Sequence, residues 1–194
     1  YNSNIDEKML REVLIMSISD NPTITKLIGY TKTGFEDNNN ITIIMPYAKK
    51  GSLRSIYDGI EKGRTPSDFT NTNRQIILIG IARGMKYLHD RNIIHRDLKP
   101  DNILLNDNYQ PSISDFGLSK IFDASNSLYQ SQHLGTQMYM APEVIKKEPY
   151  GIKADVYAFG IVMYEIVTNC YPYSKSKNKK IDNSSFNNKI AAGI

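Results

Sequence analysis

The 194-residue chain has little cysteine and no long apolar segment, and both shortages exclude whole classes of protein. Its one cysteine, Cys170, excludes an internal disulfide and the spacing of a zinc finger, and it favours a reducing, cytoplasmic compartment. The longest apolar run, 156–167, contains Glu165 and is shorter than the roughly 18 residues that a membrane-spanning helix needs. We therefore expect no membrane segment in this chain.

Excess charge is also scarce outside one short segment. The formal net charge is +4, and residues 174–189 account for all of it with five lysines and Asp182. The rest of the chain is neutral, so nucleic acid is not favoured as a partner. A segment rich in lysine, serine and asparagine is usually a solvated loop, and a docking surface for acidic partners is the alternative.

The apolar periodicity predicts a mixed chain of helices and strands. Helices are expected at 5–19, 74–90 and 155–168, and the third should be buried because it is apolar on all sides. Strands are expected at 23–31 and 40–47, on both sides of the sequence "HRDLKPDN", and at "PSISDFG". Pro46 offers no N–H to a sheet and should end its strand, which marks a boundary at 46–50 before a mostly helical part.

A polar loop interrupts two apolar strands in "RNIIHRDLKPDNILL" (91–105). Asp97 and Asn102 lie in this loop, and Asp115 follows in "SDFG". Carboxylate and amide oxygens are ligands that Mg²⁺ prefers, with phosphate oxygens completing the shell, and a carboxylate is a candidate general base. Each residue alone is explained as an ordinary polar turn residue, whereas the set indicates a magnesium and general-base site.

Several longer motifs resemble those of the eukaryotic protein kinases, in the family's order and spacing. They are "HRDLKPDN" (95–102), "DFG" (115–117), "GTQMYMAPE" (135–143) and "DVYAFG" (155–160). The resemblance implies an α+β, two-lobed fold: an incomplete small lobe at 1–45 with a helix (αC) and two strands, a hinge at 46–50, and a mostly helical large lobe at 51–194. It also implies ATP and Mg²⁺ as cofactors and protein substrates with serine or threonine acceptors.

The same resemblance implies a role for each polar residue of the loop. Asp97 would orient the substrate hydroxyl and accept its proton, and Lys99 would neutralise charge on the transferred γ-phosphoryl group. Asn102 and Asp115 would hold the two Mg²⁺ ions. Glu12, in "LREVLIM", resembles the αC glutamate that pairs with the lysine of the third strand.

The adenine of ATP would lie against residues 45–48. Met45 occupies the gatekeeper position, and the carbonyl of Pro46 can accept from the adenine amino group, although the family usually has an acidic residue there. Ala48 would supply the hinge N–H, and Leu104 would pack under the adenine. A hydrophobic spine between the lobes, anchored by Asp155, would consist of Met16, Leu27, His95 and Phe116.

Regulation and substrate type are implied by two further features. Arg96 suggests control by phosphorylation of the activation loop, since a guanidinium holds a phosphate through paired hydrogen bonds. The sequence does not rank the candidate acceptors, which are Ser125, Ser127, Tyr129 and Ser131. Lys99 and Thr136 resemble serine/threonine kinases, whereas "DFGLSK" and "DVYAFGIVMYEI" resemble the tyrosine-kinase-like group of these enzymes. We expect serine/threonine specificity, with dual specificity as the alternative.

Parts of the kinase pattern are missing from these 194 residues. No glycine-rich G-x-G-x-x-G loop and no V-A-I-K-like strand precede Glu12, and no arginine follows Arg96 to pair with Glu143. We therefore expect a fragment of a kinase domain that also lacks the last large-lobe helices, binds ATP weakly and is inactive in isolation. A catalytically inactive kinase-like interaction module is the main alternative function, which the polar residues of the loop disfavour. A small-molecule phosphotransferase is a third, which the "APE" segment disfavours.

Overall fold

A computed structural model of the chain describes residues 3–31, 42–121 and 136–173. The helices are α1 (Ser3–Ile18), α2 (Leu53–Glu61), α3 (Asn71–His89), α4 (Pro142–Ile145) and α5 (Lys153–Thr168), with short 3-10 turns η1 (Pro100–Asn102) and η2 (Gln137–Tyr139). The strands are β1 (Gly29–Thr31), β2 (Thr42–Ile44), β3 (Ile93–Ile94), β4 (Ile103–Leu105), β5 (Pro111–Ile113) and β6 (Lys120–Ile121).

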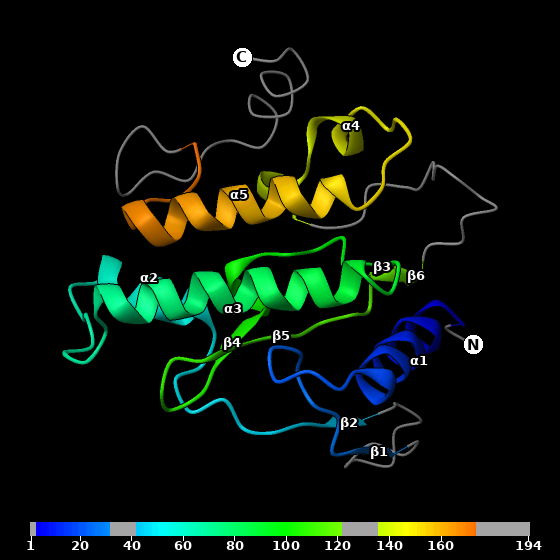
Figure 1. Ribbon diagram of the computed structural model, residues 1–194, viewed down its shortest axis with the longest axis horizontal. Coiled ribbons are helices and arrows are strands. Elements are labelled where there is room, and N and C mark those ends of the chain that lie inside the picture. Colours follow the sequence, from blue (N-terminus) through cyan, green and yellow to red (C-terminus); the bar gives the residue numbers. More distant parts are fainter. Residues whose placement is uncertain (1–2, 32–41, 122–135, 174–194) are drawn as a thin grey trace.

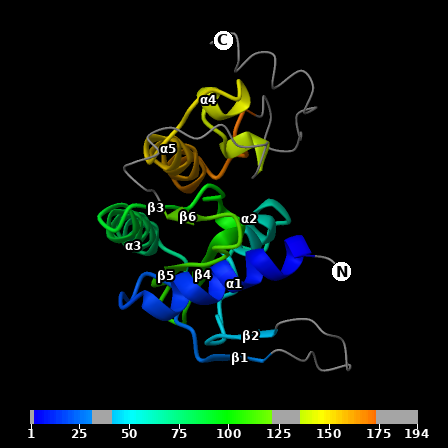
Figure 2. The same cartoon turned by 90° about the vertical axis from the view of Figure 1, so that its right-hand side faces the viewer.

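The strands form antiparallel pairs rather than one large sheet. β1 pairs with β2, β3 with β6, and β4 with β5. Figure 1 shows α3 and α5 stacked one above the other, with β4 and β5 beneath α3 and the pair β1–β2 at the far side from α5. The view in Figure 2 agrees, because α4 and α5 lie at one end and β1 and β2 at the other. The loop between β3 and β4, which carries the predicted site, therefore lies in the middle of the molecule.

The core is built around α3 and the strand β5. The predicted apolar face of α3 is confirmed, since Ile77, Ile81 and Leu88 are fully buried. α3 approaches β5 closely because Gly80 and Gly84 face it: a Cβ atom on Gly84 would lie only 2.7 Å from the Cδ1 atom of Ile113. Two glycines four residues apart on one helix face thus set the distance between helix and strand.

The predicted helices at 5–19 and 74–90 are confirmed, with starts two or three residues earlier. The strand predicted at 23–31 is wrong over most of its length, because only residues 29–31 pair with β2. Residues 23–25 instead run alongside β5 and bond to it. The N–H of Thr25 donates to the carbonyl of Ile113 at 2.8 Å, and the N–H of Ile113 donates to the carbonyl of Thr23 at 2.9 Å. The apolar periodicity also did not predict α2, the helix that follows the predicted hinge.

The prediction that residues 155–168 form a buried helix is wrong in one respect. α5 is a helix, and Val162 and Ile166 on one face are fully buried against the core. Val156 and Val167, however, are 57% and 67% exposed. The physical reason is that α3 and the segment around η2 pack on one face of α5, while Val156, Met163 and Val167 elsewhere on the helix stay exposed.

Candidate active site

Asp97 is held in a fixed orientation inside the loop between β3 and η1. Its side chain is only 6% exposed, and the ammonium group of Lys99 lies 2.7 Å from its Oδ2 atom. The backbone N–H of Thr136 donates to Oδ1 at 2.9 Å. The side-chain amide of Asn102 donates to the Asp97 carbonyl at 2.8 Å and to Oδ2 at 3.3 Å. Both carboxylate oxygens are therefore fixed by neighbours from two different segments.

Lys99 connects the loop to the segment at 136–139. Its ammonium group donates both to Asp97 and to the hydroxyl of Thr136, the latter at 2.9 Å. Lys99 and Asp97 come from the loop, whereas Thr136 lies 37 residues further along the chain. The structure thus brings the predicted catalytic carboxylate, the predicted phosphate-neutralising lysine and Thr136 into direct contact.

The loop is anchored to the buried carboxylate of Asp155 at the start of α5. The backbone N–H groups of His95 and Arg96 donate to its two oxygens at 2.8 and 2.9 Å. The ring Nε2 of His89, at the end of α3, lies 2.9 Å from Oδ2. Arg96 itself has a left-handed backbone with φ of 70°, a strained conformation for a non-glycine residue that such anchoring stabilises.

The segment that carries Asp115 is bonded directly to Asn102. Ser114 donates its N–H to the Asn102 carbonyl at 2.9 Å and its hydroxyl to the same oxygen at 3.1 Å. Asp115 follows with φ of 64°, again left-handed. Because the side-chain nitrogen of Asn102 is used in bonds to Asp97, its Oδ1 atom is directed away from Asp97 and remains available as a ligand.

This donor set fits a magnesium ion that is completed by phosphate oxygens. No cluster of three or more His, Cys, Asp or Glu side chains suited to a metal occurs within the described parts of the chain. One carboxylate and one amide oxygen alone make an incomplete shell, as expected where a nucleotide supplies the remaining oxygens.

Glu12 on α1 faces the segment of Asp115 and Phe116. Burial, together with the nearby Asp115 charge, raises the pKa of Glu12, while the backbone N–H groups of Phe116 and Asp115 bond to its carboxylate and oppose that rise. Glu12 therefore lies close to the backbone of this segment. Its pairing with a lysine of a third strand stays a prediction.

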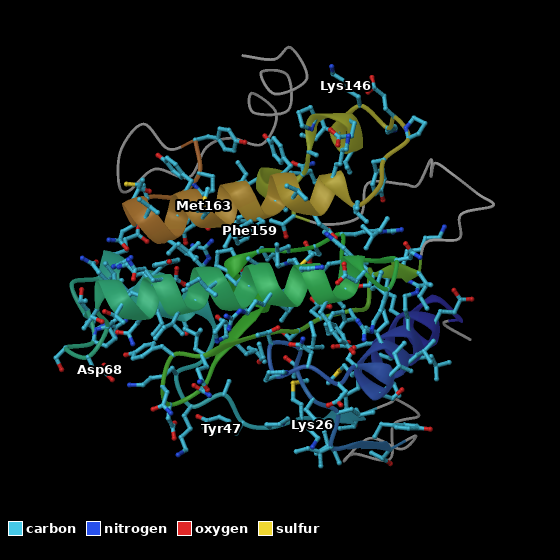
Figure 3. All side chains as sticks on the ribbon, viewed as in Figure 1. Lys26, Tyr47, Asp68, Lys146, Phe159 and Met163 are labelled. Atoms are coloured by element: carbon cyan, nitrogen blue, oxygen red, sulfur yellow. The ribbon has the colours of Figure 1, made fainter. Side chains whose placement is uncertain are left out.

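The residues predicted to contact adenine lie on the connection from β2 to α2 and on β4. The carbonyl of Pro46 and the N–H of Ala48 make no hydrogen bond within the described residues. Pro46, Ala48 and Leu104 line one cavity of about 740 Å³, a size typical of ligand pockets. Tyr47, between them, is 86% exposed and points outward, as Figure 3 shows.

The structure does not bring every predicted site residue to this cavity. Met45 packs against the core, and Glu12, Asn102 and Asp115 are not part of the cavity wall. This cavity therefore includes only part of the predicted nucleotide site.

The predicted spine residues lie in one apolar cluster. Met16, His95 and Phe116 are buried, and Leu27 packs against the same core. The rings of His95 and Phe116 meet edge to face with centroids 5.3 Å apart. The backbone of His95 bonds to Asp155, so the cluster is joined to α5 through the loop.

A group of cations surrounds Arg96. The Nε atom of Arg96 is buried and has no hydrogen-bond partner among the described residues. Burial lowers the pKa of Arg96, and the charge of Arg11 on α1 adds to the lowering. Burial followed by the charges of Arg96 and Arg11 also lowers the pKa of Lys120 on β6. Arg11 was missed at the sequence level because only the fold brings α1 beside the loop.

The candidate phosphorylation sites Ser125, Ser127, Tyr129 and Ser131 lie outside the described residues, as does the lysine-rich segment 174–189. None of the described helices combines the length and the apolar character needed to cross a membrane.

Comparison with known proteins agrees with the geometry of the loop. The protein kinase domain family model matches residues 1–192, and the chain belongs to this family. It is 38% identical to the probable serine/threonine-protein kinase PBL5 of Arabidopsis thaliana, over 89% of this chain and 40% of that protein. It is 36% identical to the serine/threonine-protein kinase CTR1 of the same plant, over 86% of this chain and 20% of that protein.

One relative from another organism is named as a kinase of dual specificity. The chain is 35% identical to the dual specificity protein kinase shkB of Dictyostelium discoideum, over 90% of this chain and 26% of that protein. The chain therefore spans less than half of the length of each of these relatives. The predicted two-lobed kinase fold is confirmed at the level of the family.

Proposed function

We propose that the protein carrying this chain is a serine/threonine protein kinase, which transfers the γ-phosphate of ATP to hydroxyl groups of protein substrates. The observation that supports the proposal most directly is the contact of Asp97 with both Lys99 and Thr136 at 2.7 and 2.9 Å. A buried carboxylate with a cation beside it is suited to orient a hydroxyl and to accept its proton. The names of the relatives support the same activity.

In this proposal each residue acts at a stated atom. The Asp97 carboxylate orients the substrate hydroxyl and takes up its proton as the phosphorus–oxygen bond forms. Lys99 shares its ammonium protons between Asp97 and Thr136, and it can donate to an oxygen of the transferred phosphoryl group. Because phosphoryl transfer has a loose, charge-rich transition state, such positioning and charge neutralisation supply most of the catalysis.

ATP and Mg²⁺ belong to the same proposal. Asn102 Oδ1 and the Asp115 carboxylate would hold the metal, and the free Pro46 carbonyl and Ala48 N–H would receive the adenine. Bound Mg²⁺ would neutralise phosphate charge during transfer. Glu12 would help to position the Asp115–Phe116 segment, whose backbone it faces.

The test is phosphate transfer from ATP to a generic protein substrate by the natural full-length protein and its Asp97→Asn variant. We expect the variant to lose about 10²- to 10⁴-fold in rate, the range for loss of a general base. Asp107→Asn is a matched control, since Asp107 is a half-exposed carboxylate that also binds a lysine, Lys49, at 2.6 Å. We expect the control to retain the wild-type rate.

Two outcomes would contradict the proposal. Retained transfer by Asp97→Asn would remove Asp97 from its role. A wild-type protein that transfers no phosphate would instead favour the inactive interaction module.

Regulation by phosphorylation is a second part of the proposal. Arg96 has an unpaired Nε donor and a second guanidinium, Arg11, nearby, which together favour an anion. The anion would be a phosphate on Ser125, Ser127, Tyr129 or Ser131. Mass spectrometry of the active protein should find phosphate on one of them, and fully active protein without phosphate in 122–135 would refute this part.

Substrate type and location complete the proposal. The Lys99–Thr136 contact supports serine/threonine acceptors, and shkB keeps dual specificity open. The single cysteine supports a reducing, cytoplasmic compartment.

A further inference from the structure

Arg54 on α2 makes many side-chain contacts, although the sequence predicted no role for it. One nitrogen, Nη2, donates to the hydroxyl of Tyr139 at 2.6 Å and to the two oxygens of Glu165 at 3.0 and 3.3 Å. Its Nε lies 3.6 Å from Asp101, and its guanidinium stacks 4.5 Å from the ring centre of Tyr171. The side chain is only 12% exposed.

These contacts join four separate segments of the chain. Arg54 belongs to α2, Asp101 to η1 within the catalytic loop, Tyr139 to η2 and Glu165 to α5. Tyr139 closes the arrangement, because its hydroxyl accepts from Arg54 and donates to Glu165 at 2.9 Å. Burial first of all raises the pKa of Tyr139, so the phenol keeps the proton that it donates.

Arg54 and Glu165 form a close, buried pair, with Nη2 of Arg54 3.0 Å from Oε1 of Glu165. Burial raises the pKa of Glu165, and the charge of Arg54 together with the bonds from Arg54 and Tyr139 opposes part of this rise. Burial alone would lower the pKa of Arg54, yet Tyr139 and Glu165 more than offset it, so the pKa is raised. A guanidinium that touches a carboxylate at 3.0 Å has the bonds that compensate the burial of both charges.

A short chain of bonds leads from Arg54 to the catalytic carboxylate. Arg54 fixes the hydroxyl of Tyr139, and the backbone N–H of Tyr139 donates to the carbonyl of Thr136 at 2.9 Å. Thr136 in turn donates its own N–H to Asp97 and accepts from Lys99. On its other side, Arg54 contacts Asp101, which precedes Asn102 in η1.

We propose that Arg54 is a positioning residue, which holds the segment 136–139 and the loop residue Asp101 in register so that Thr136 meets Asp97. The consequence for reaction rate rests on the proposed kinase function, whereas the structural part does not. Lysine cannot replace arginine here, because its single ammonium group lacks the planar fork that reaches Tyr139, Glu165 and Asp101 together.

The first test is amide hydrogen exchange in the natural full-length protein. In Tyr139→Phe, which removes only the hydroxyl, and in Arg54→Lys, the amides of Thr136 and Tyr139 should exchange at least about fivefold faster, since their bonds open more often. The double variant should exchange no faster than the faster single variant, because both changes break one network.

Arg74→Lys is the matched control. Arg74 also reaches the end of α5, where it donates to the Ile166 carbonyl at 2.7 Å and to Asn169 at 2.6 Å, but within the described residues it bonds to neither Asp101 nor Tyr139. This variant should leave the amide hydrogen exchange of residues 136–139 unchanged. Unchanged exchange at 136–139 in Tyr139→Phe, or equal acceleration in the control, overturns the proposal.

The second test is steady-state kinetics with a protein substrate. In Tyr139→Phe and Arg54→Lys, kcat should fall about tenfold to a hundredfold, as for a small misplacement of catalytic groups, while KM for ATP changes less than about threefold. A wild-type kcat in both variants overturns the proposal. If the wild-type protein transfers no phosphate, the proposed function fails, and the exchange experiment alone decides about Arg54.

Discussion

The loop at 95–102 and the N-terminal part of the structure differ in how completely the described residues supply their hydrogen-bond partners and apolar contacts. Asp97 and Asp155 are buried, and both carboxylate oxygens of each accept hydrogen bonds: Asp97 from its own loop and from Thr136, and Asp155 from the backbone of His95 and Arg96. The N-terminal part instead exposes large apolar side chains on α1, β1 and β2 and in the segment before β1; these are Leu10, Leu14, Ile18, Ile28, Tyr30 and Ile44. The chemistry of the loop is thus organised within the described residues, whereas the packing of the N-terminal part is not.

This difference has an energetic meaning. Complete burial of a large apolar side chain contributes about 1.5–3 kcal/mol, so the half-exposed residues of α1 forgo much of that stabilisation. The polar network around the loop fixes the positions of the loop residues, because each buried donor or acceptor there would be costly to leave unpaired. We expect the loop to resist local opening more strongly than α1 does.

The largest effect is expected from a break in the anchor of the loop. Asp155→Ala leaves the buried N–H groups of His95 and Arg96 without acceptors, at about 1–3 kcal/mol each. The free energy of unfolding should fall by roughly 3–5 kcal/mol in urea titrations, when the lost contact with His89 is included.

Asp90→Ala is the control for this change. Asp90 is an exposed carboxylate that pairs with Lys86 one helical turn away, and such a pair contributes little. Its loss should change stability by less than about 0.5 kcal/mol. Similar effects of the two substitutions would show that the loop is not anchored through Asp155.

A smaller but sharper comparison lies within α1 itself. Ile15 is fully buried and its neighbour Leu14 is 49% exposed. Ile15→Ala should cost about 2–5 kcal/mol, whereas Leu14→Ala should cost less than about 1 kcal/mol, since alanine also favours the helix. Equal costs, measured by thermal and urea unfolding, would mean that the outer face of α1 is covered in the protein.

Much of the site could be predicted because its residues are close in sequence. Asp97, Lys99 and Asn102 lie within six residues, so one short motif brings them together. Thr136, which Lys99 contacts, lies in a second motif at 135–143. Family resemblance gave the fold class for the same reason. The motifs are local, and the fold that surrounds them belongs to the family.

What could not be predicted depends on contacts between distant segments. Arg54 lies in a stretch for which the sequence predicted neither a helix nor a function, and only the approach of η2 and α5 gives it partners. The expected burial of α5 failed because an apolar sequence shows that a helix can be covered, and not which neighbours cover it. Residues 23–25 bond to β5 and not to β2, and apolar periodicity does not show which of two strands a segment will pair with.

The smallest effect is expected where the two regions meet, at Gly84 on α3. A Cβ atom there would lie 2.7 Å from Ile113 Cδ1 and 2.9 Å from the Thr23 hydroxyl oxygen, so both the N-terminal part and β5 must shift. Gly84→Ala should destabilise the protein by about 1–3 kcal/mol, even though alanine favours a helix by about 1 kcal/mol.

Gly160→Ala in α5 makes the same chemical change where no described atom lies within 4 Å. It should therefore show the helix preference alone, a gain of up to about 1 kcal/mol in the free energy of unfolding. Opposite signs for the two glycines would confirm that close contact, rather than helix propensity, joins α3 to the strand beneath it. A loss at Gly160 would instead show that the exposed face of α5 is packed against another part of the protein, so that α5, like the loop at 95–102, would have its contacts supplied.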